Sequence, residues 1–284
     1  MFGFINIDKP KGMTSHDVVA VLRRITKIKQ IGHTGTLDPF ATGVLPICIG
    51  KATRLIEYLS DDKAYIATVQ FGSNTDTYDI DGEVLQVFDK KTTRDEVENI
   101  LPDFRGEIEQ VPPIYSAIKV NGKKLYEYAR KGEEVEIKPR RVNIKELTLM
   151  NFDYQAQSAQ LLVKCSAGTY IRSLAYDIGK DLGIGAHLIE LQRIQAGNFV
   201  IDKTVSLENL TIEQVEQSLI NPLDVLDYVK LEATENDLGK IKNGVALSDK
   251  NVPINETIFI TTQGRICAVG FSKDNIISLK KVFL

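Results

Sequence analysis

The sequence predicts an α+β protein in which a mainly antiparallel mixed sheet is flanked by helices and followed by a small β-rich module. Strand-like and helical patterns follow one another irregularly, without the steady alternation of a parallel α/β sheet. Near residue 228 the pattern changes to short apolar runs at close spacing. The length of 284 residues, 43% of them hydrophobic, suits one large domain and one small one. We therefore expect a main domain at residues 1–228 and a β-rich module at 229–284.

The first predicted helix runs from about Thr14 to Lys29. Thr14 and Asp17 have the spacing of a capping box, and apolar residues recur after them at helical intervals. The following segment is rich in glycine and proline, which is typical of an ordered loop, and it runs into an apolar stretch at 44–50. That stretch predicts a buried strand.

The middle of the chain carries further strands and helices. Residues 63–72 place alternate apolar side chains on one face, which predicts a strand. A short strand at 84–88 follows an Asp-Gly turn, and a short helix at 93–101 is expected to stop at Pro102. The same patterns predict strands at 141–153 and 159–166 and helices at 170–182 and 211–219.

The last part of the chain has the pattern of a small sheet with one helix. Residues 231–242 are expected to be helical. The apolar runs after them are short and lie close together, as in small β-rich modules. They predict strands at 258–262, 266–271 and 276–284.

Composition favours an intracellular globular protein. The apolar fraction can form a core, which excludes disorder as the dominant state. No apolar run approaches the roughly 18–20 residues of a membrane helix, and the first residues lack the pattern of a signal peptide. Cys48, Cys165 and Cys267 lie far apart among apolar neighbours, which indicates reduced, buried thiols in a cytoplasmic protein.

The net charge of −3 hides an uneven distribution of charged residues. Residues 1–60 carry eight Lys and Arg against four Asp and Glu, and residues 119–145 carry nine against four. Residues 201–228 carry one against six. Phosphate binding depends on the local electrostatic field and not on the net charge, so the basic stretches are compatible with a nucleic-acid partner. They are equally compatible with charged faces that only contact solvent.

Patterns for metals and nucleotide cofactors are absent from the sequence. The three histidines are scattered, without the spacing of a zinc site. There is no G-x-G-x-x-G, and the nearest approach to a phosphate loop, between Gly43 and Lys51, has the wrong spacing. We expect no metal and no cofactor.

Two segments have the features of a functional site. Asp38 follows a Gly-rich loop and precedes Pro39, which keeps its backbone out of a helix and fixes its direction. Arg172 lies in the first turn of a predicted helix, where the helix dipole disfavours a cation unless a carboxylate or phosphate accompanies it. Asp-Pro also occurs in ordinary turns, and a solvated arginine explains the second segment equally well.

Several stretches resemble the TruB family of tRNA pseudouridine-55 synthases. They include NIDKPKGMTSHDVV, GHTGTLDPFATGVLPICIGKATR, KAYIATVQFGSNTDTYDIDGEV, CSAGTYIRSLAYDIG and LIELQRIQAGNF, in the order found in the family. They extend almost continuously over residues 3–200, whereas the tail is only loosely similar to the small PUA-like RNA-binding module of bacterial members. The resemblance implies the pseudouridine synthase fold and isomerisation of uridine 55 in the TΨC loop of tRNA, without cofactor or metal.

The resemblance also implies site residues. Asp38 matches the catalytic aspartate, which could attack the sugar or the base or take a proton from C2′, and Arg172 matches the arginine that keeps this carboxylate ionised. Four further positions match residues that contact the target nucleotide. His33 matches the histidine that takes part in extruding it, and Tyr65 matches the tyrosine that stacks on its base. Leu191 matches a leucine that packs in the pocket, and Tyr170 matches a pocket residue that contacts the substrate.

The RNA backbone is expected to contact basic residues outside this pocket. We assign this role to Lys9, Lys123 and Arg141, and we interpret residues 119–145 as an insertion that closes over the RNA. The target uridine must be flipped out of its loop, at a cost of a few kcal/mol. The partner is therefore the T-arm of tRNA, and the protein is expected to act as a monomer.

Two alternatives stay open at this point. One is an enzyme of the same superfamily that works within a guide-RNA particle, although the abbreviated tail favours the stand-alone bacterial type. The other is a non-catalytic protein that binds or folds tRNA and retains the same fold. The presence of Asp38, Tyr65 and Arg172 favours an enzyme over a pure binder.

Overall fold

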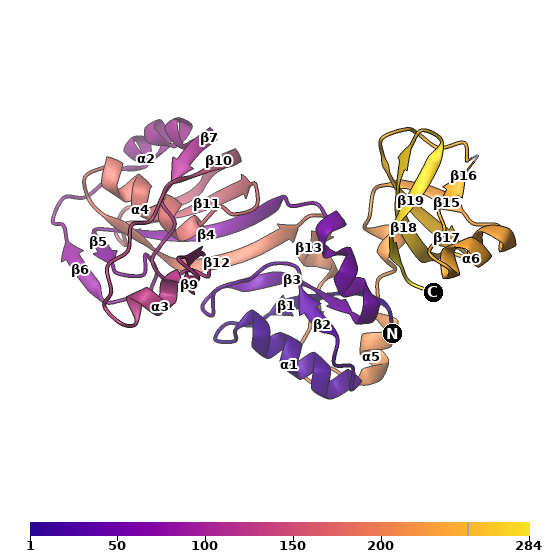
Figure 1. Cartoon of the computed structure of the whole chain (residues 1–284). Coiled ribbons are helices and arrows are strands. Elements are labelled where there is room, and N and C mark those ends of the chain that lie inside the picture. The colour runs from indigo at the N-terminus through magenta and orange to yellow at the C-terminus, as the bar shows by residue number, and fades with distance from the viewer. Residues whose placement is uncertain (249) are drawn as a thin grey trace.

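A computed structural model describes residues 1–248 and 250–284 and contains two separate β-sheets of five or more strands (Figure 1). The larger is a mixed sheet of ten strands in the order β14-β1-β3-β12-β4-β11-β10-β7, with β13 paired to β12 and β2 to β3. Only the pairs β1–β14 and β12–β3 are parallel, so the predicted α+β class with a mainly antiparallel sheet is confirmed. The strands are β1 (Gly3–Lys9), β2 (Ile31–His33), β3 (Thr42–Ile49), β4 (Lys63–Phe71), β7 (Gly106–Gln110), β10 (Arg140–Asp153), β11 (Ser158–Cys165), β12 (Ala186–Ala196), β13 (Phe199–Val200) and β14 (Val205–Ser206).

Helices α1 (Ser15–Thr26), α2 (Arg94–Ile100) and α4 (Ile171–Asp181) pack on one face of this sheet. Their apolar side chains share one core cluster with alternate residues of β4, because successive side chains of a strand point to opposite faces. The predicted capping box is present, since Thr14 Oγ1 accepts a hydrogen bond from Asp17 N at 3.1 Å. Helix α1 ends earlier than predicted, because Lys27 adopts a left-handed backbone conformation.

The main sheet divides near its centre. Strand β12 pairs with β4 along most of its length but meets β3 at only two residue pairs, Gln192–Thr42 and Arg193–Gly43. Before Thr42 the chain leaves the sheet as the loop that joins β2 to β3. Asp38 lies in that loop, four residues before Thr42.

Several short elements complete the main unit. A hairpin, β5 (Ser73–Thr75) and β6 (Val84–Val87), follows β4, and α5 (Ile212–Gln217) lies beside α1. The insertion, which we define as residues 111–139 between β7 and β10, contains β8 (Lys119–Val120), β9 (Lys123–Lys124) and α3 (Leu125–Ala129). The predicted helix ends before Pro102, at Ile100, and the chain continues as a 3-10 helix, η2 (Leu101–Phe104), because proline fits the first turn of a new helix.

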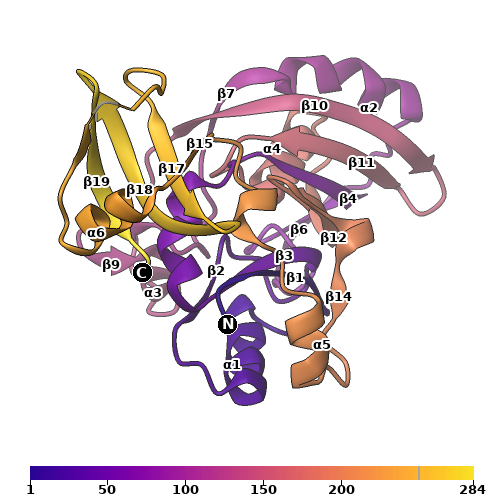
Figure 2. The same ribbon diagram turned by 90° about the vertical axis from the view of Figure 1, so that its right-hand side faces the viewer.

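The second sheet has the order β15-β17-β18-β19-β16 and lies against the main unit (Figure 2). Its elements are β15 (Val229–Glu232), α6 (Glu235–Lys242), β16 (Leu247–Ser248), β17 (Thr257–Thr262), β18 (Arg265–Lys273) and β19 (Ile276–Val282). The helix predicted from residue 231 begins only at Glu235, because Thr234 caps it and the residues before that pair with β17 as a strand.

The two sheets share an apolar core. Phe259 and Val269 of the second sheet join Phe4, Val44 and Leu55 of the main unit in one cluster of buried side chains. The predicted boundary near residue 228 therefore separates two sheets that bury one another's apolar surface, and a cut at this point would expose the cluster. Leu55 belongs to η1, a 3-10 helix over Gly50–Tyr58.

All three cysteines, Cys48, Cys165 and Cys267, are buried and free, as predicted. Burial raises the pKa of the Cys48 thiol to about 12 and that of Cys165 to about 11, so both are unreactive thiols at neutral pH. Among the helices of residues 1–248 and 250–284, none combines the length and apolar character needed to cross a membrane.

Candidate active site

A cleft of about 620 Å³ opens between the loop before β3 and the strands β4 and β12. Its walls come from the first turn of α1, the loop before β3, the start of β4, the insertion, the loop between β11 and α4, and β12. Together with the first turn of α4, these segments bring five predicted site residues into one cavity: Asp38, Tyr65, Tyr170, Arg172 and Leu191. The fold thus assembles one cavity from residues that lie far apart in the sequence.

The loop that carries Asp38 is held by buried side chains. Asp38 begins a tight turn with Pro39 in its second position, and its carbonyl accepts a hydrogen bond from the N–H three residues later at 3.1 Å. The N–H of Leu37 donates to Ser15 Oγ at 2.9 Å, and Arg193 donates to a carbonyl of the preceding loop at 3.2 Å. Elements α1 and β12 therefore fix this loop from two sides.

Lys9 anchors the same loop from below, and its predicted contact with the RNA backbone is wrong. The Lys9 side chain has no solvent-exposed surface. Its ammonium group donates to the carbonyls of Pro10 at 2.9 Å, Met13 at 2.6 Å and Pro39 at 3.2 Å. Burial lowers the pKa of Lys9 to about 8, against the opposing effect of the Asp38 charge. A phosphate cannot reach this ammonium group.

Arg172 lies beneath Asp38 and is almost fully buried. Its Nε is 2.9 Å from Asp38 Oδ2, and its Nη2 donates to Asp38 Oδ1 at 3.2 Å. Nη1 is 3.3 Å from Oδ2 of a second carboxylate, Asp79, and donates to the carbonyl of Thr77 at 3.0 Å, while Nη2 also donates to the carbonyl of Tyr115. The Asp38 side chain is 32% exposed and that of Arg172 is 5% exposed, so the carboxylate faces the cleft from a buried cation.

Asp79 is a member of the site that sequence reasoning missed. Its carboxylate is 7% exposed and accepts hydrogen bonds from Thr77 Oγ1 at 2.6 Å and from Asp81 N at 3.1 Å. Burial raises the pKa of Asp79, and these hydrogen bonds and the charge of Arg172 oppose that effect. The run of three aspartates in DTYDIDG was the available signal, but nothing local shows which one turns inward.

Tyr65 and Leu191 form the apolar floor of the cleft. They come from the paired strands β4 and β12 and are 8% and 6% exposed. Burial raises the pKa of the Tyr65 hydroxyl, against the effect of the nearby Arg193 charge. Tyr170 begins α4 at the rim, where its backbone exchanges two hydrogen bonds with Gln110, at 2.8 and 3.0 Å.

Two histidines meet near this cleft. The rings of His16 and His33 pack edge to face with centroids 5.2 Å apart. His16 is exposed and lines the cleft, whereas His33, the residue predicted to act on the target nucleotide, lies behind it on β2. Burial, followed by the charges of His16 and Arg193, lowers the pKa of His33, which keeps its ring neutral at pH 7.

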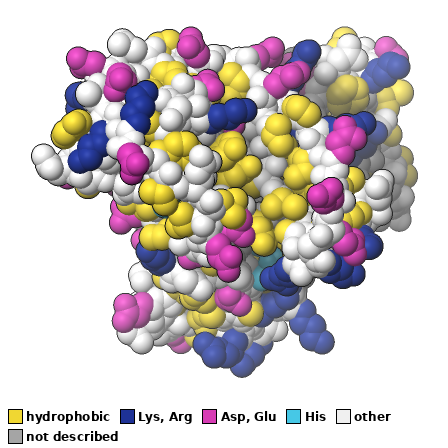
Figure 3. All heavy atoms as spheres, turned by 90° about the vertical axis from the view of Figure 1, so that its left-hand side faces the viewer, with side chains coloured by type: hydrophobic (Ala, Val, Ile, Leu, Met, Phe, Trp, Pro, Cys, Tyr) yellow, Lys and Arg dark blue, Asp and Glu magenta, His cyan; other side chains and the backbone are white. Residues whose placement is uncertain are grey.

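Lys123 and Arg141 lie outside the cleft, on different elements. Lys123 is in the insertion, half-exposed, with its Nζ 3.5 Å from Glu133 Oε2. Arg141 is exposed on β10, so the insertion ends before it and the predicted stretch 119–145 includes part of the main sheet. On the face shown in Figure 3, Lys and Arg side chains gather at the lower right beside an exposed histidine.

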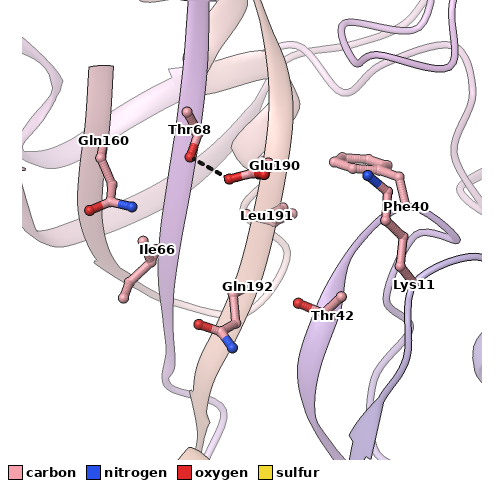
Figure 4. A pocket seen from close by; sticks show the side chains of 9 residues that line it. All are labelled: Lys11, Phe40, Thr42, Ile66, Thr68, Gln160, Glu190, Leu191 and Gln192. Atoms are coloured by element: carbon pink, nitrogen blue, oxygen red, sulfur yellow. Dashed lines mark hydrogen bonds between the residues drawn. The ribbon is translucent and has the colours of Figure 1, made fainter. Parts of the chain in front are cut away.

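A second, smaller pocket of about 260 Å³ lies on the opposite face of the sheet (Figure 4). Ile66 and Thr68 of β4 point into it, because they alternate with the residues that face the first cleft. Thr68 Oγ1 donates to Glu190 Oε2 at 3.2 Å across its upper rim. Leu191 borders both cavities, so only a thin wall separates them.

The chain offers no obvious metal site in the part that the structure describes. No group of three or more His, Cys, Asp and Glu side chains within residues 1–248 and 250–284 is arranged to hold a metal ion. At Asp38 the cleft presents a partly exposed carboxylate on a buried guanidinium, beside an aromatic ring and a leucine.

Comparison with known proteins gives consistent matches. Residues 23–171 match the family described as TruB family pseudouridylate synthase (N terminal domain), and residues 172–227 match the tRNA pseudouridylate synthase B C-terminal domain. The protein named tRNA pseudouridine synthase B from Clostridium tetani is 45% identical over 257 residues, which cover 89% of this chain and 88% of that protein. Its counterpart from Clostridium novyi is 40% identical over 291 residues and covers all of both chains.

Solved structures with a similar fold include that of a Cbf5-Nop10-Gar1 complex. The matched chain has a TM-score of 0.73 and 26% sequence identity, over 100% of this chain and 85% of that one. A second match, with a TM-score of 0.73 and 25% identity, is the structure of an H/ACA RNP bound to a substrate RNA containing 2′-deoxyuridine. The fold similarity therefore extends over the whole chain, including the second sheet.

Proposed function

Because the chain belongs to the TruB family of pseudouridylate synthases, we propose that it converts uridine to pseudouridine in tRNA, at position 55 of the TΨC loop. Relatives named tRNA pseudouridine synthase B match almost their whole length, at 40 and 45% identity in the two compared above. The isomerisation breaks the N1–C1′ bond, turns the base and joins C5 to C1′, with no net redox change and no group donor. This reaction requires a carboxylate beside the ribose and a surface that binds the base after the N1–C1′ bond breaks.

The observation that carries this proposal is the position of Asp38. Its carboxylate faces the cleft while Arg172, 2.9 Å away, is buried beneath it. A charge-assisted contact of this kind orients a carboxylate and balances its charge in a partly buried site. Asp38 is therefore the catalytic residue, as nucleophile toward the sugar or the base, or as the base that takes a proton from C2′.

The target base would rest between the floor and the rim of the cleft. The ring of Tyr65 offers a flat surface for stacking, Leu191 packs beside it, and Tyr170 borders the opening. The Tyr65 hydroxyl is a hydrogen-bonding group for the base and, because burial raises its pKa, stays protonated. Entry into the cleft requires the uridine to leave its stack, and we assign His33 to that step together with His16, which reaches the cleft wall.

The RNA backbone would lie across the insertion and the adjoining strands. Lys123 and Arg141 are exposed cations on this side, and Lys124 and Tyr126 extend the wall of the cleft outward. We propose that the insertion closes over the T-arm and that residues 229–284 form a PUA-like module that adds affinity for the tRNA body. The expected site of action is the cytoplasm, where tRNA is modified.

The stand-alone form of the enzyme is favoured over a guide-RNA particle. Identity to the proteins named tRNA pseudouridine synthase B is 40–45%, against 25–26% for the two matched particle chains. We therefore propose that the protein acts as a monomer on tRNA. A protein that only binds or refolds tRNA remains an outcome of the test that follows.

The test is incubation of the full chain with unmodified tRNA, without added metal or nucleotide, followed by mapping of pseudouridine. We expect one modified position, in the T-loop. A tRNA with cytidine at that position is the matched control and should yield none. Binding of tRNA without any pseudouridine would support the non-catalytic reading, and modification only with a guide RNA would support the particle.

A further inference from the structure

Lys63 is a half-buried cation that the proposed chemistry does not use. It begins β4 and lies two residues before Tyr65, so both side chains point to the same face of the sheet. Lys63, Tyr65 and Asp38 all line the cleft. The Lys63 side chain therefore lines the same cavity as the carboxylate, and its Cα lies about 7 Å along the strand from that of Tyr65.

Other cations near the cleft have protein partners, and Lys63 has none among residues 1–248 and 250–284. No hydrogen-bond acceptor or carboxylate lies within bonding distance of its Nζ in that part of the chain. The neighbouring Asp62 is instead bonded to Lys145, with both oxygens at 2.7 Å. Asp61 lines the cleft but lies beyond ion-pair distance. Arg172, in contrast, has two carboxylates.

The missing partner and the partial burial of Lys63 are reflected in its pKa. Burial and the nearby charge of Arg193 lower its pKa, while Asp61 and Asp62 oppose the shift only in part. An ammonium group that is partly removed from water without a partner destabilises the free protein. The cleft thus holds a positive charge whose counter-charge the protein does not supply.

Unused backbone donors lie on the same side of the cleft. Cys165 of β11 pairs in register with Lys63, and the loop 166–169 that follows it lines the cavity. The N–H groups of Ala167, Gly168 and Thr169 donate no hydrogen bond to any described residue. Gly168 has a φ of +83°, with open space where a side chain would be. A cation and free N–H groups together suit an anion with several oxygens.

We propose that Lys63 binds a backbone phosphate of the RNA strand beside the flipped uridine. This inference rests on the proposed function, which brings a polyanion into the cleft. A phosphate meets the ammonium as a point charge and can also accept from the loop N–H groups. Lys63 is thereby an RNA-binding residue that holds the target strand, and it takes no part in bond breaking.

The test compares Lys63→Met and Lys63→Arg with Lys164→Met in the full chain. Lys164 is a matched control, because it lies on the neighbouring strand, half-exposed, and is paired with Glu146 at 2.7 Å. For Lys63→Met we expect the Kd for unmodified tRNA to rise about tenfold near 0.1 M salt, and the slope of log Kd against log salt to fall by about 0.7–0.9. Lys63→Arg should retain most of the affinity, and Lys164→Met should bind as wild type does.

Two further readouts separate RNA binding from a structural role. The melting temperature of Lys63→Met without RNA should equal or exceed that of the wild type, because an unpartnered charge is removed. The single-turnover rate at saturating tRNA should stay within about twofold of wild type. If Lys63→Met does not fold, Lys63→Gln replaces it in the same comparison.

An unchanged salt slope in the Lys63 variants would overturn the inference, as would a lower melting temperature with unchanged affinity. These outcomes are distinct from failure of the proposed function. If the wild type binds tRNA and forms no pseudouridine, the function fails, and the Kd values alone still decide the role of Lys63.

Discussion

The loop that carries Asp38 and the insertion at 111–139 face each other across the cleft but are held in different ways. The loop is anchored by Ser15, Lys9 and Arg193, which are buried and come from three different elements. The tip of the insertion bonds mainly to itself, as when Tyr128 Oη donates to the carbonyl of Val120 at 3.0 Å. Contacts with the rest of the protein therefore fix the conformation of the Asp38 loop, whereas contacts within the insertion fix that of its tip.

This difference suits the two tasks that we assign to the regions. A catalytic carboxylate has to be held to within about 0.5 Å of its productive position, which a rigid loop provides. A surface that grips RNA has to follow a ligand that changes shape as a base leaves its stack. Few contacts to the main unit leave the tip free to move.

Arg172 connects the two regions. The same guanidinium contacts Asp38 and donates to the carbonyl of Tyr115 at the root of the insertion, at 3.0 Å. Ser173 Oγ adds a second bond to this root, at the carbonyl of Val111. Because one side chain holds both the carboxylate and the root, the proposed closure of the insertion on RNA would act on the site through Arg172.

Replacing Asp38 should give the largest effect, since it removes the group that the rigid loop exists to hold. Asp38→Asn keeps the size of the side chain, so folding and tRNA binding should persist. We expect the rate to fall by many orders of magnitude, beyond the 10²–10⁴ typical of one acid–base helper. The measurement is tritium release from C5 of labelled uridine in tRNA under single-turnover conditions. Substantial release by this variant would disprove the assignment of Asp38.

Arg172→Lys should have the next largest effect, because it tests the connection between the regions. Lysine keeps the charge but loses the planar fork that contacts Asp38 and Asp79 together. A lost charge-assisted bond is worth about 1.5–3 kcal/mol, so we expect a single-turnover rate about 100-fold lower. Far-UV circular dichroism should be unchanged. A rate within threefold of wild type would show that the fork is dispensable.

Lys9→Met tests whether rigidity of the loop matters for catalysis. It removes the ammonium donor from three carbonyls, of which only that of Pro39 keeps another donor, the N–H of Gly12, and we expect about 2–3 kcal/mol less stability in urea unfolding. The saturating rate should fall about tenfold while the tRNA Kd stays near that of wild type, because Lys9 has no exposed surface. A weakened Kd with a normal rate would return Lys9 to the RNA-binding role predicted from sequence.

The wild type should also show a pH signature of Lys9. Burial lowers the pKa of this ammonium group to about 8, below its ordinary value of 10.5. Between these pH values the unfolded chain binds more protons than the folded one, so the free energy of unfolding should rise with pH across this range. Lys9→Met should lack this rise when the two proteins are compared by urea unfolding from pH 7.5 to 10.

Sequence patterns predicted the elements that depend on local information. The capping box of α1 and the alternation of β4 were visible because side chains within one turn or strand specify them. The helix start near residue 231 was wrong, because pairing of β15 with β17 is a contact over a long separation. Resemblance to a family supplied the candidate residues, and Asp38 and Arg172 do lie in one cleft.

The parts of the site that escaped prediction all depend on distant contacts. Lys9 was misassigned because the sequence does not show that carbonyls of two loops converge on it. Asp79 was missed because its partner Arg172 lies 93 residues further along the chain. Lys63 was missed because only the assembled cleft shows that it lacks a counter-charge. Features set by neighbouring residues can be predicted from the sequence, whereas ion pairs between distant residues can be identified only in the folded structure.

The smallest effects are expected on the adaptable side of the comparison. Lys123 and Arg141 are exposed, and a cation that binds a phosphate in the ground state and the transition state acts on affinity alone. For Lys123→Ala and Arg141→Glu we expect the tRNA Kd to rise about threefold to tenfold near 0.1 M salt, with a salt slope lower by about one per lost contact. Arg94→Ala is the control, because Arg94 is an exposed cation on α2, outside the cleft and the insertion, and its Kd should be unchanged. Single-turnover rates at saturating tRNA should match wild type in all three.

If both salt slopes equal that of wild type, the side chains of Lys123 and Arg141 contact only solvent, and other residues of the insertion bind the RNA. If the saturating rate falls as well, the insertion shapes the reacting geometry, and the division between a rigid catalytic loop and an adaptable grip is wrong.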